Sequence, residues 1–382
     1  MQYREFPGLE WKPSALGFGG MRLPVIDGDQ AKVDIPESTR MIRYAIDNGV
    51  NYLDTAYFYH GGYAEQAVEH ALRDGYREKI KLATKFPYRE VSSRSDFDPA
   101  FERQLERLQT EKIDFYLLHG LHRPVWENLS DMGIVSWLED KVAEGYLGHL
   151  GFSFHDDYEY FTQVVDAYDN WTFCQVHFNF MDTDYQAGRR GIEYAAARGL
   201  GVIIMEPLRG GQLAQTPPEK IARVWESTPA QRSPVEWALR WIWNYPEVSL
   251  VLSGMSTMEQ VIENVNIAAR AGNSNLNADE LAFMDRVRQA YIELSPVPCT
   301  GCRYCMPCPN GVEIPGIFRV YGQMIMYGNT RMAKRRYSPG PWGIGSGEDA
   351  THCTECGECS EKCPQHISIP EWLKKVHEEL TQ

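Results

Sequence analysis

The residues in this sequence that are best suited to chemistry are eight cysteines gathered in two short runs. CTGCRYCMPCP carries Cys299, Cys302, Cys305 and Cys308, and CTECGECSEKCP carries Cys353, Cys356, Cys359 and Cys363. Each run has three cysteines at CxxCxxC spacing and a fourth directly before a proline. Zinc would need only two CxxC pairs, whereas thiolates at this density typically bind iron and sulfide. In a reducing compartment such crowding indicates metal rather than disulfides.

A second set of candidate residues comprises an acid, a phenol, an amine and an imidazole in three separate motifs. Asp54 and Tyr59 lie in DTAYFY, Lys85 in ATK, and His119 in LLH. A phenol with a pKa of about 10 is a reluctant proton donor and base at neutral pH, and an ammonium ion beside it stabilises the phenolate. In this scheme Lys85 activates Tyr59, and Asp54 pairs with Lys85 and fixes its position. His119 would donate a hydrogen bond to an oxygen on which negative charge develops, and this step needs no metal.

Short apolar runs that alternate with amphipathic helical patterns predict the elements that position these residues. Candidate strands cover 15–20, 51–55, 80–85, 114–119, 147–153, 173–178, 201–206 and 248–254. Stretches such as SPVEWALRWIWN, with apolar residues three and four apart, lie between them and predict helices. Eight strands alternating with helices predict an α/β fold, a (β/α)8 TIM barrel. An open dinucleotide-binding sheet is disfavoured, because Arg22 stands where GFGGMR would need its third fingerprint glycine.

In a TIM barrel the functional side chains lie where strands end and loops begin. At or near the predicted strand ends lie Asp54, Lys85, His119, Ser153, Gln175, Glu206 and Ser253, with Tyr59 in the loop after the second strand. The motifs DTAYFY, TK and LLH resemble the Asp, Tyr, Lys and His tetrad of the aldo-keto reductase family in type, order and the five-residue gap between Asp54 and Tyr59. The resemblance covers roughly residues 1–270. It implies an oxidoreductase that uses NADP(H) or NAD(H) to interconvert a small-molecule carbonyl and alcohol, with Tyr59 as general acid and base.

The same resemblance implies a set of contacts to the nicotinamide cofactor. Ser153 and Gln175 match positions that bond the carboxamide group, and Met205 lies where many family members place an aromatic ring under the nicotinamide. The stretch PLRGG matches the pyrophosphate loop, in which small residues let the backbone approach. The residues of this loop that match are Pro207, Leu208 and Gly210.

The sequence departs from the family where the adenosine 2'-phosphate would bind. Gly254 and Gln260 align with the lysine and arginine that bind this phosphate, while Glu263 and Asn264 are kept. Without an ammonium or guanidinium ion at these positions, we expect little discrimination between NADP(H) and NAD(H), unless other basic residues compensate.

The two cysteine runs belong to an internal duplication. CPNGVEIPGIF from Cys308 aligns with CPQHISIPEWL from Cys363, and in both copies a helical pattern begins at the second proline. The runs resemble those of bacterial-type ferredoxins, which implies a small, mainly α-helical domain with two 4Fe-4S clusters. In such domains the fourth cysteine of each run typically ligates the other cluster. One cluster would then be bound by Cys299, Cys302, Cys305 and Cys363, and the other by Cys308, Cys353, Cys356 and Cys359.

Three segments are therefore expected along the chain. They are a barrel over 1–276, a connecting helix and linker over 277–298, and the iron-sulfur domain over 299–382. Few apolar residues of the last segment lie outside two short helices, so we expect the clusters to hold its fold together. Its basic run from Arg331 to Arg336 is interpreted as a solvated helix end, or else as counter-charge for the clusters or for an acidic redox partner protein.

The two halves of the sequence differ in the number of electrons that their chemistry moves. A nicotinamide gives up two electrons together whereas each cluster carries one, so a direct path needs a converter such as flavin. No flavin motif is recognised in the sequence, and flavin stays among the candidate cofactors. The favoured hypothesis is an aldo-keto reductase whose iron-sulfur domain is structural, partner-docking or redox-sensing. The alternative is an electron-transfer protein in which the clusters exchange single electrons with the barrel site.

Composition limits the partners that this chain is expected to have. A formal net charge of -14 and a pI near 5.2 disfavour nucleic acid and anionic membranes as partners. The 382 residues are enough for one large core and a small satellite domain. Neither a signal-peptide pattern nor an apolar run long enough to span a membrane is found, so the cytoplasm is the expected location.

Overall fold

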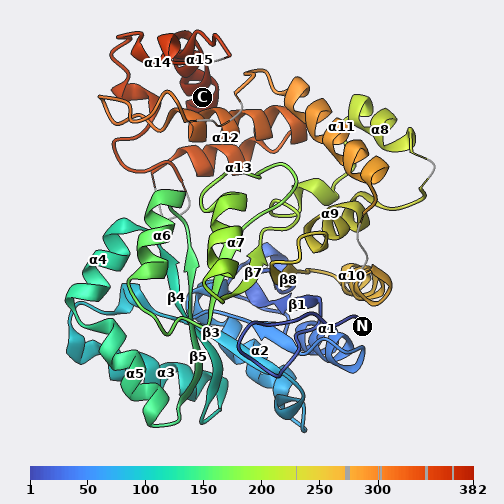
Figure 1. The fold of residues 1–382 in the computed structure, drawn as a ribbon, viewed down its shortest axis with the longest axis vertical. Coiled ribbons are helices and arrows are strands. Elements are labelled where there is room, and N and C mark those ends of the chain that lie inside the picture. Colours follow the sequence, from blue (N-terminus) through green and yellow to red (C-terminus); the bar gives the residue numbers. More distant parts are fainter. Residues whose placement is uncertain (229, 272–275, 300, 302, 340–342, 364) are drawn as a thin grey trace. The chain divides into compact units, whose positions relative to one another are not determined.

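The computed structural model describes residues 1–382 except 229, 272–275, 300, 302, 340–342 and 364 (Figure 1). The chain divides into two compact units. The first unit comprises Met1–Gly211 and Arg232–Asn277, and the second comprises Gln212–Gln231 and Ala278–Gln382. The second unit thus includes a segment from the middle of the chain as well as the cysteine-rich end. The three segments expected from the sequence remain a proposal beside this division.

Eight parallel strands of the first unit close into a barrel in sequence order, with β8 paired to β1. The strands are β1 (Leu16–Gly19), β2 (Tyr52–Asp54), β3 (Lys81–Phe86), β4 (Ile113–Leu121), β5 (Leu147–Phe154), β6 (Phe173–His177), β7 (Gly201–Met205) and β8 (Val248–Gly254). Each overlaps one of the strands expected from the sequence. The predicted TIM barrel is therefore confirmed.

Amphipathic helices lie around the strands of the first unit (Figure 1). They are α1 (Ile35–Asp47), α2 (Ala64–Leu72), α3 (Phe97–Leu108), α4 (Arg123–Asp131), α5 (Ile134–Ala143), α6 (Tyr158–Asp166), α7 (Gly188–Ala197), α9 (Pro234–Trp243) and α10 (Met258–Ala271). Side-chain caps fix where several of them begin: Asp34 accepts a hydrogen bond from a backbone N–H of α1, and Ser233 does the same for α9.

An aromatic plug fills the end of the barrel where the strands begin. The Phe6 ring lies 5.7 Å from the Phe115 ring and 6.5 Å from the Phe173 ring, and Phe6 is buried. Gly201, the first residue of β7, makes this possible, because a Cβ atom there would lie 2.2 Å from Cζ of Phe6. With this end closed by apolar rings, the polar side chains at the strand ends belong to the opposite mouth.

The second unit is mainly helical. Its helices are α8 (Glu219–Glu226), α11 (Ala278–Leu294), α12 (Ile314–Tyr327), α13 (Thr330–Tyr337), α14 (Glu358–Glu361) and α15 (Ile369–Thr381). The segment between β7 and α9 supplies α8, which packs beside α11: the Trp225 and Phe283 rings are 5.7 Å apart, and Lys220 pairs with Glu293 at 3.4 Å. The two duplicated motifs start α12 and α15 alike, each with a proline in its first turn.

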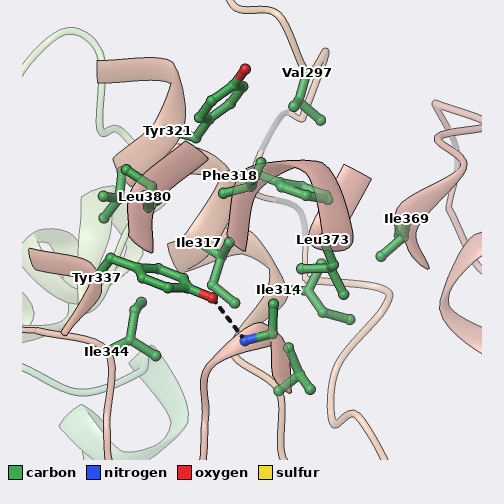
Figure 2. Packing of buried hydrophobic residues seen from close by; sticks show 14 of the residues in the cluster. Val297, Ile314, Ile317, Phe318, Tyr321, Tyr337, Ile344, Ile369, Leu373 and Leu380 are labelled. Atoms are coloured by element: carbon green, nitrogen blue, oxygen red, sulfur yellow. Dashed lines mark hydrogen bonds between the residues drawn. The ribbon is translucent and has the colours of Figure 1, made fainter. Parts of the chain in front are cut away.

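The second unit has a larger apolar core than its sequence suggested. Residues from α12, α13 and α15, together with the segments before them, form one buried cluster (Figure 2). Ile317 and Val376 are fully buried, and the Tyr337 hydroxyl accepts a hydrogen bond from the backbone N–H of Ala350 at 3.2 Å. This core was not evident from the sequence, because single apolar residues in loops, such as Val312 and Ile344, pack into the same cluster as the helix residues. Among the described residues, no helix combines the length and apolar character needed to cross a membrane.

Candidate active site and iron-sulfur sites

Asp54, Tyr59, Lys85 and His119 come together where β2, β3 and β4 end. Nζ of Lys85 donates to Oδ1 of Asp54 at 2.6 Å and to the backbone oxygen of Thr55 at 2.9 Å. The same ammonium lies 4.9 Å from the centre of the Tyr59 ring, whose edge faces the His119 ring at 5.9 Å. All four residues predicted for catalysis from the sequence thus share one site.

Local irregularities of the backbone aim two of these side chains. The pairing between β4 and β5 shifts register between Leu118 and Leu121, and such a bulge re-aims the side chain it contains, here that of His119. Tyr59 begins a short turn in which His60 is left-handed, with φ of 53°. The His60 ring fastens this turn, because its Nε2 accepts from the Leu23 N–H at 3.1 Å and its Nδ1 lies 3.2 Å from the Gln30 oxygen.

Burial and the Lys85 charge set the ionisation of this site. Burial opposes the charge of Lys85, yet Asp54 and Tyr59 together raise its pKa above the ordinary value. Burial likewise raises the pKa of Tyr59, and the Lys85 ammonium partly opposes that rise. Burial and then Lys85 lower the pKa of His119 well below 6.5, so its imidazole is neutral near pH 7. Its Nδ1 atom is buried and hydrogen-bonds to none of the described residues.

A buried polar network behind β3 holds the Lys85 backbone in place. Oε1 of Glu65 accepts hydrogen bonds from Thr84 at 2.7 Å and from Gln104 at 2.8 Å. Gln104 in turn donates to the backbone oxygen of Lys85 at 3.0 Å and accepts from the Tyr116 hydroxyl at 2.6 Å. Because partly satisfied buried networks are costly, these contacts favour one position of the strand. No motif in the sequence predicted this network.

Ser153 and Gln175 are register partners on β5 and β6, and their free hydrogen-bonding capacity suits a carboxamide. The Ser153 hydroxyl oxygen accepts from the Gly120 N–H at 2.7 Å, which leaves its own O–H to donate. Oε1 of Gln175 is buried without a hydrogen-bond partner among the described residues, and Nε2 lies 3.8 Å from the Met205 sulfur. An amide group placed here would accept from Ser153 and donate to Gln175, so these residues fit a nicotinamide.

The loop after β7, which contains Pro207, Leu208 and Gly210, is tightly coiled. Arg209 and Gly210 have φ of 52° and 68°, and Gly211 follows with 87°. Such successive left-handed residues favour glycine, which explains the GG pair. The Gly211 N–H donates to the Leu208 oxygen at 3.0 Å and closes the coil.

A charged cluster that the sequence analysis missed anchors this loop. The buried Arg209 guanidinium donates to Oδ1 of Asp182 at 2.8 Å, and the other carboxylate oxygen lies 3.0 Å from Nε2 of His177. The amide of Asn179 donates both to Asp182 at 3.1 Å and to the Glu206 oxygen at 3.1 Å. The polar residues directly after β6, in HFNFMD, were the available signal for it.

Arg22 occupies the space at the end of β8 where the sequence lacks the expected cations. A Cβ atom on Gly254 would lie 3.0 Å from the stem of Arg22, so the missing side chain makes room for it. The Arg22 guanidinium lies 3.6 Å from the Glu206 carboxylate. Gln260 caps the start of α10, because its Oε1 accepts a hydrogen bond from the Ser256 N–H at 2.8 Å. Asn264 donates to the Ser253 hydroxyl at 2.9 Å.

The segments after β2, β4 and β5 carry further aromatic and histidine side chains. The Trp126 ring packs 6.1 Å from Trp171, and His155 Nδ1 lies 3.3 Å from the Gln186 amide oxygen. Burial lowers the pKa of His155 to about 4 and also lowers that of His122. Phe58 stacks beside His119 with ring centres 6.2 Å apart, an arrangement that the sequence analysis did not anticipate.

Four cysteines of the second unit line one pocket. Cys308, Cys353, Cys356 and Cys359 are among the residues that line one small pocket. These four are the set expected for one cluster, with Cys308 contributed by the other run. Among the described residues, no three cysteine, histidine or acidic side chains converge closely enough to hold a single metal ion. Four thiols that line one pocket, three of them at CxxCxxC spacing, match the ligands of a four-iron cluster.

The other four predicted ligands are only partly described. Cys363 is buried in the apolar core, and Cys299 and Cys305 pack against it. Cys302 lies outside the described residues. The ninth cysteine, Cys174, is fully buried in β6 of the barrel, where burial raises the pKa of its thiol.

The fold and these sites define a TIM-barrel protein with a cysteine-rich domain of the iron-sulfur kind. Residues 15–289 match the model of the Aldo/keto reductase family, and residues 298–368 match that of a 4Fe-4S dicluster domain. The chain therefore belongs to the aldo/keto reductase family and carries a 4Fe-4S domain C-terminal to its barrel.

Relatives with established names or structures match most of the chain. Methylglyoxal reductase of Escherichia coli (strain K12) is 27% identical over 281 residues, which are 69% of this chain and 87% of the relative. The holo form of an aldo-keto reductase from Bacillus halodurans is 28% identical with a TM-score of 0.61, covering 75% of this chain and 96% of that chain. An aldo-keto reductase from Klebsiella pneumoniae in complex with NADPH shares the fold at 24% identity and a TM-score of 0.58, with the same coverage.

Proposed function

We propose that the barrel catalyses the nicotinamide-dependent reduction of a small carbonyl compound and the reverse oxidation of the alcohol, with Tyr59 as general acid and base. The observation that carries this proposal is the position of Lys85, which is buried against Asp54 and lies beside the Tyr59 ring. The name of the E. coli relative, a methylglyoxal reductase, supports a small carbonyl compound as substrate.

Each residue of the site has a distinct part in this reaction. Tyr59 donates its phenol proton to the oxygen of the carbonyl group as that oxygen gains negative charge. Lys85 stabilises the phenolate that remains, and Asp54 keeps the ammonium charged and in place. His119, which is neutral, orients the carbonyl oxygen by a hydrogen bond from its N–H.

We propose NADP(H) or NAD(H) as the partner in this reaction. A bound reduced nicotinamide would supply a hydride to the carbonyl carbon. Ser153 and Gln175 would hold its carboxamide, Met205 would lie against its ring, and the coil after β7 would meet its pyrophosphate. The NADPH in the Klebsiella relative and the unpaired oxygen of Gln175 support this assignment.

For the second unit we propose two 4Fe-4S clusters with crossed fourth ligands and a structural, docking or sensing role. Cys353, Cys356 and Cys359 would bind one cluster with Cys308, and the first run would bind the other with Cys363. This pairing is supported by the pocket that is lined by Cys308, Cys353, Cys356 and Cys359. Bound clusters would supply single-electron chemistry, which the reaction proposed for Tyr59 and Lys85 does not need.

The test is the oxidation of NADPH and NADH by the anaerobic holoprotein in the presence of small aldehydes. Tyr59→Phe should lower turnover at least about a hundredfold while nicotinamide binding, followed by fluorescence, stays within about twofold. Tyr63→Phe removes a hydroxyl four residues further along the same loop from a half-exposed ring and should leave turnover unchanged. If Tyr59→Phe keeps more than about a hundredth of the wild-type turnover under conditions where the chemical step is rate-limiting, Tyr59 is not the general acid.

A further inference from the structure

Two aromatic rings, those of Phe58 and Tyr88, form a wall beside the imidazole of His119. Phe58 stacks on His119 with an interplanar angle of 23°, and Tyr88, from the segment after β3, meets the same imidazole edge-on at 6.4 Å. Phe58 and Tyr88 also contact each other, with ring centres 6.2 Å apart. This apolar surface, continuous with His119, would lie against the body of whatever carries the carbonyl group.

Arg89 is fixed at the outer edge of this wall. Its guanidinium carbon lies 5.3 Å from the centre of the Phe58 ring and 5.3 Å from that of Tyr88. Its Nε donates to the Tyr88 hydroxyl at 3.0 Å. Two ring contacts and a hydrogen bond hold a side chain that is otherwise exposed, so its charge has a defined position relative to His119.

Among the described residues, no carboxylate lies within 4.0 Å of the Arg89 guanidinium, so it forms no close ion pair there. Other arginines near the barrel mouth are paired: Arg107 lies 3.6 Å from Glu65, and Arg22 lies 3.6 Å from Glu206. Burial is the main cause of the lowered pKa values of His119 and His122, and the positive charge of Arg89 adds to the lowering of both.

We propose that Arg89 binds a carboxylate of the substrate, so that the barrel acts on carbonyl compounds in which an apolar stem separates the carbonyl from an anionic group. The stem packs against Phe58 and Tyr88 while the carbonyl meets Tyr59. A planar guanidinium binds a carboxylate through two parallel hydrogen bonds, which gives direction as well as attraction. This inference rests on the proposed carbonyl reduction and narrows its substrate class.

The ortho, meta and para isomers of carboxybenzaldehyde test it, because they move the carboxylate around one aromatic stem. Their methyl esters are matched probes without the charge. Wild-type holoprotein should prefer one acid isomer over its ester in kcat/KM. Arg89→Gln should lower kcat/KM for that acid at least about tenfold, the loss expected for a hydrogen bond to a charged group, and change the ester less than about twofold.

Arg94→Gln is the matched control. Arg94 lies in the same connection between β3 and α3 and over an aromatic ring, with its guanidinium carbon 5.4 Å from the centre of Phe97. It differs in having partners, since it donates to the Gly133 oxygen at 3.1 Å and lies 3.7 Å from Asp140. The acid-to-ester ratio should therefore be unchanged in Arg94→Gln.

Binding of the acids, measured by ligand-observed NMR, separates this inference from the proposed reaction. Saturable binding that weakens in Arg89→Gln, without turnover of acid or ester, would support the anion site and contradict the reductase proposal. Turnover of acid and ester at a ratio that Arg89→Gln leaves unchanged would overturn the anion site and leave the reductase proposal standing. Failure of all three acids to bind or react would likewise count against Arg89 as a carboxylate site.

Discussion

Lys85 and Asp54 form a salt bridge of 2.6 Å in which the side chains are only 1% and 4% exposed. The pair joins the ends of β2 and β3, and Lys85 extends from it toward Tyr59. Removing one partner from a buried pair leaves an uncompensated charge, which costs more than the pair itself contributes. The pair therefore ties the ionisation of Tyr59 to the stability of the barrel.

Lys85→Met should damage both activity and stability. Without the ammonium, Tyr59 loses the charge that stabilises its phenolate, so kcat for carbonyl reduction should fall at least about a hundredfold. The barrel should lose about 3 kcal/mol of unfolding free energy, because Asp54 is left buried and unpaired. Denaturant unfolding followed by tryptophan fluorescence and steady-state kinetics measure the two effects.

Lys81→Met is the control for that variant. Lys81 lies on the same strand, and its ammonium pairs with Asp114 at 3.2 Å but is 38% exposed. Exposed pairs contribute about 1 kcal/mol or less, so this variant should fold and turn over normally. Equal losses in the two variants would show that charge on β3, rather than the position of Lys85, is what matters.

The pH dependence of kcat/KM for reduction should be flat from about pH 7 to pH 9. The pKa of His119 is lowered well below 6.5, so the imidazole stays neutral as the pH falls toward 7. Tyr59 must be protonated to donate, and burial raises its pKa above 10.0, so activity should fall only as the pH rises past that value. An inflection near pH 6.5 that disappears in His119→Asn would contradict this account.

Discrimination between NADPH and NADH should be weak and should depend on Arg22. Gly254 and Gln260 offer no cation, and Arg22 lies over Gly254 with a side chain that is 37% exposed. Fluorescence titration should give a preference below about a hundredfold, which corresponds to roughly 3 kcal/mol. Arg22→Gln should reduce any preference by no more than about fivefold, since exposed pairs are screened. A larger wild-type preference would reveal another group at the 2'-phosphate.

Cys308→Ala should remove the cluster built on the second run, although Cys308 belongs to the first. The four-cysteine pocket predicts this result, because Cys308 lines it with Cys353, Cys356 and Cys359. Iron in the anaerobic protein should fall from about eight to about four atoms per chain. Electron paramagnetic resonance should show which cluster is lost, and Cys174→Ala, in the barrel core, should lose neither. Loss of the first-run cluster instead would refute the crossed pairing.

The strands and the positions of the tetrad could be predicted from the sequence because all strands of a parallel barrel run in the same direction. Each apolar run ends at one mouth, so Asp54, Lys85 and His119 had to approach one another. Placements that depend on contacts between distant segments could not be predicted. Arg22 reaches the space over Gly254 only because the ends of β1 and β8 lie side by side, and the position of the Arg89 guanidinium depends on how Phe58 and Tyr88 pack.

The packing of α8 could not be predicted for a related reason. The segment EKIARVWE has the ordinary pattern of a barrel helix, and nothing in it reveals that α8 packs beside α11. Its partner is set by the apolar surface of α11, including Phe283, more than fifty residues further along the chain. The proposed barrel segment 1–276 includes 212–231, whereas the division into compact units groups these residues with α11.

In the proposed reaction the barrel reduces a carbonyl directly, without single electrons from the clusters. The most direct measurement uses reduced nicotinamide cofactor deuterated at either face of C4 and follows the alcohol product by mass spectrometry. Our account predicts that one of the two labelled cofactors delivers its deuterium to the carbinol carbon of nearly every product molecule. Product formed at full rate with solvent hydrogen at that carbon from both cofactors would contradict it and would favour delivery of single electrons through the iron-sulfur domain.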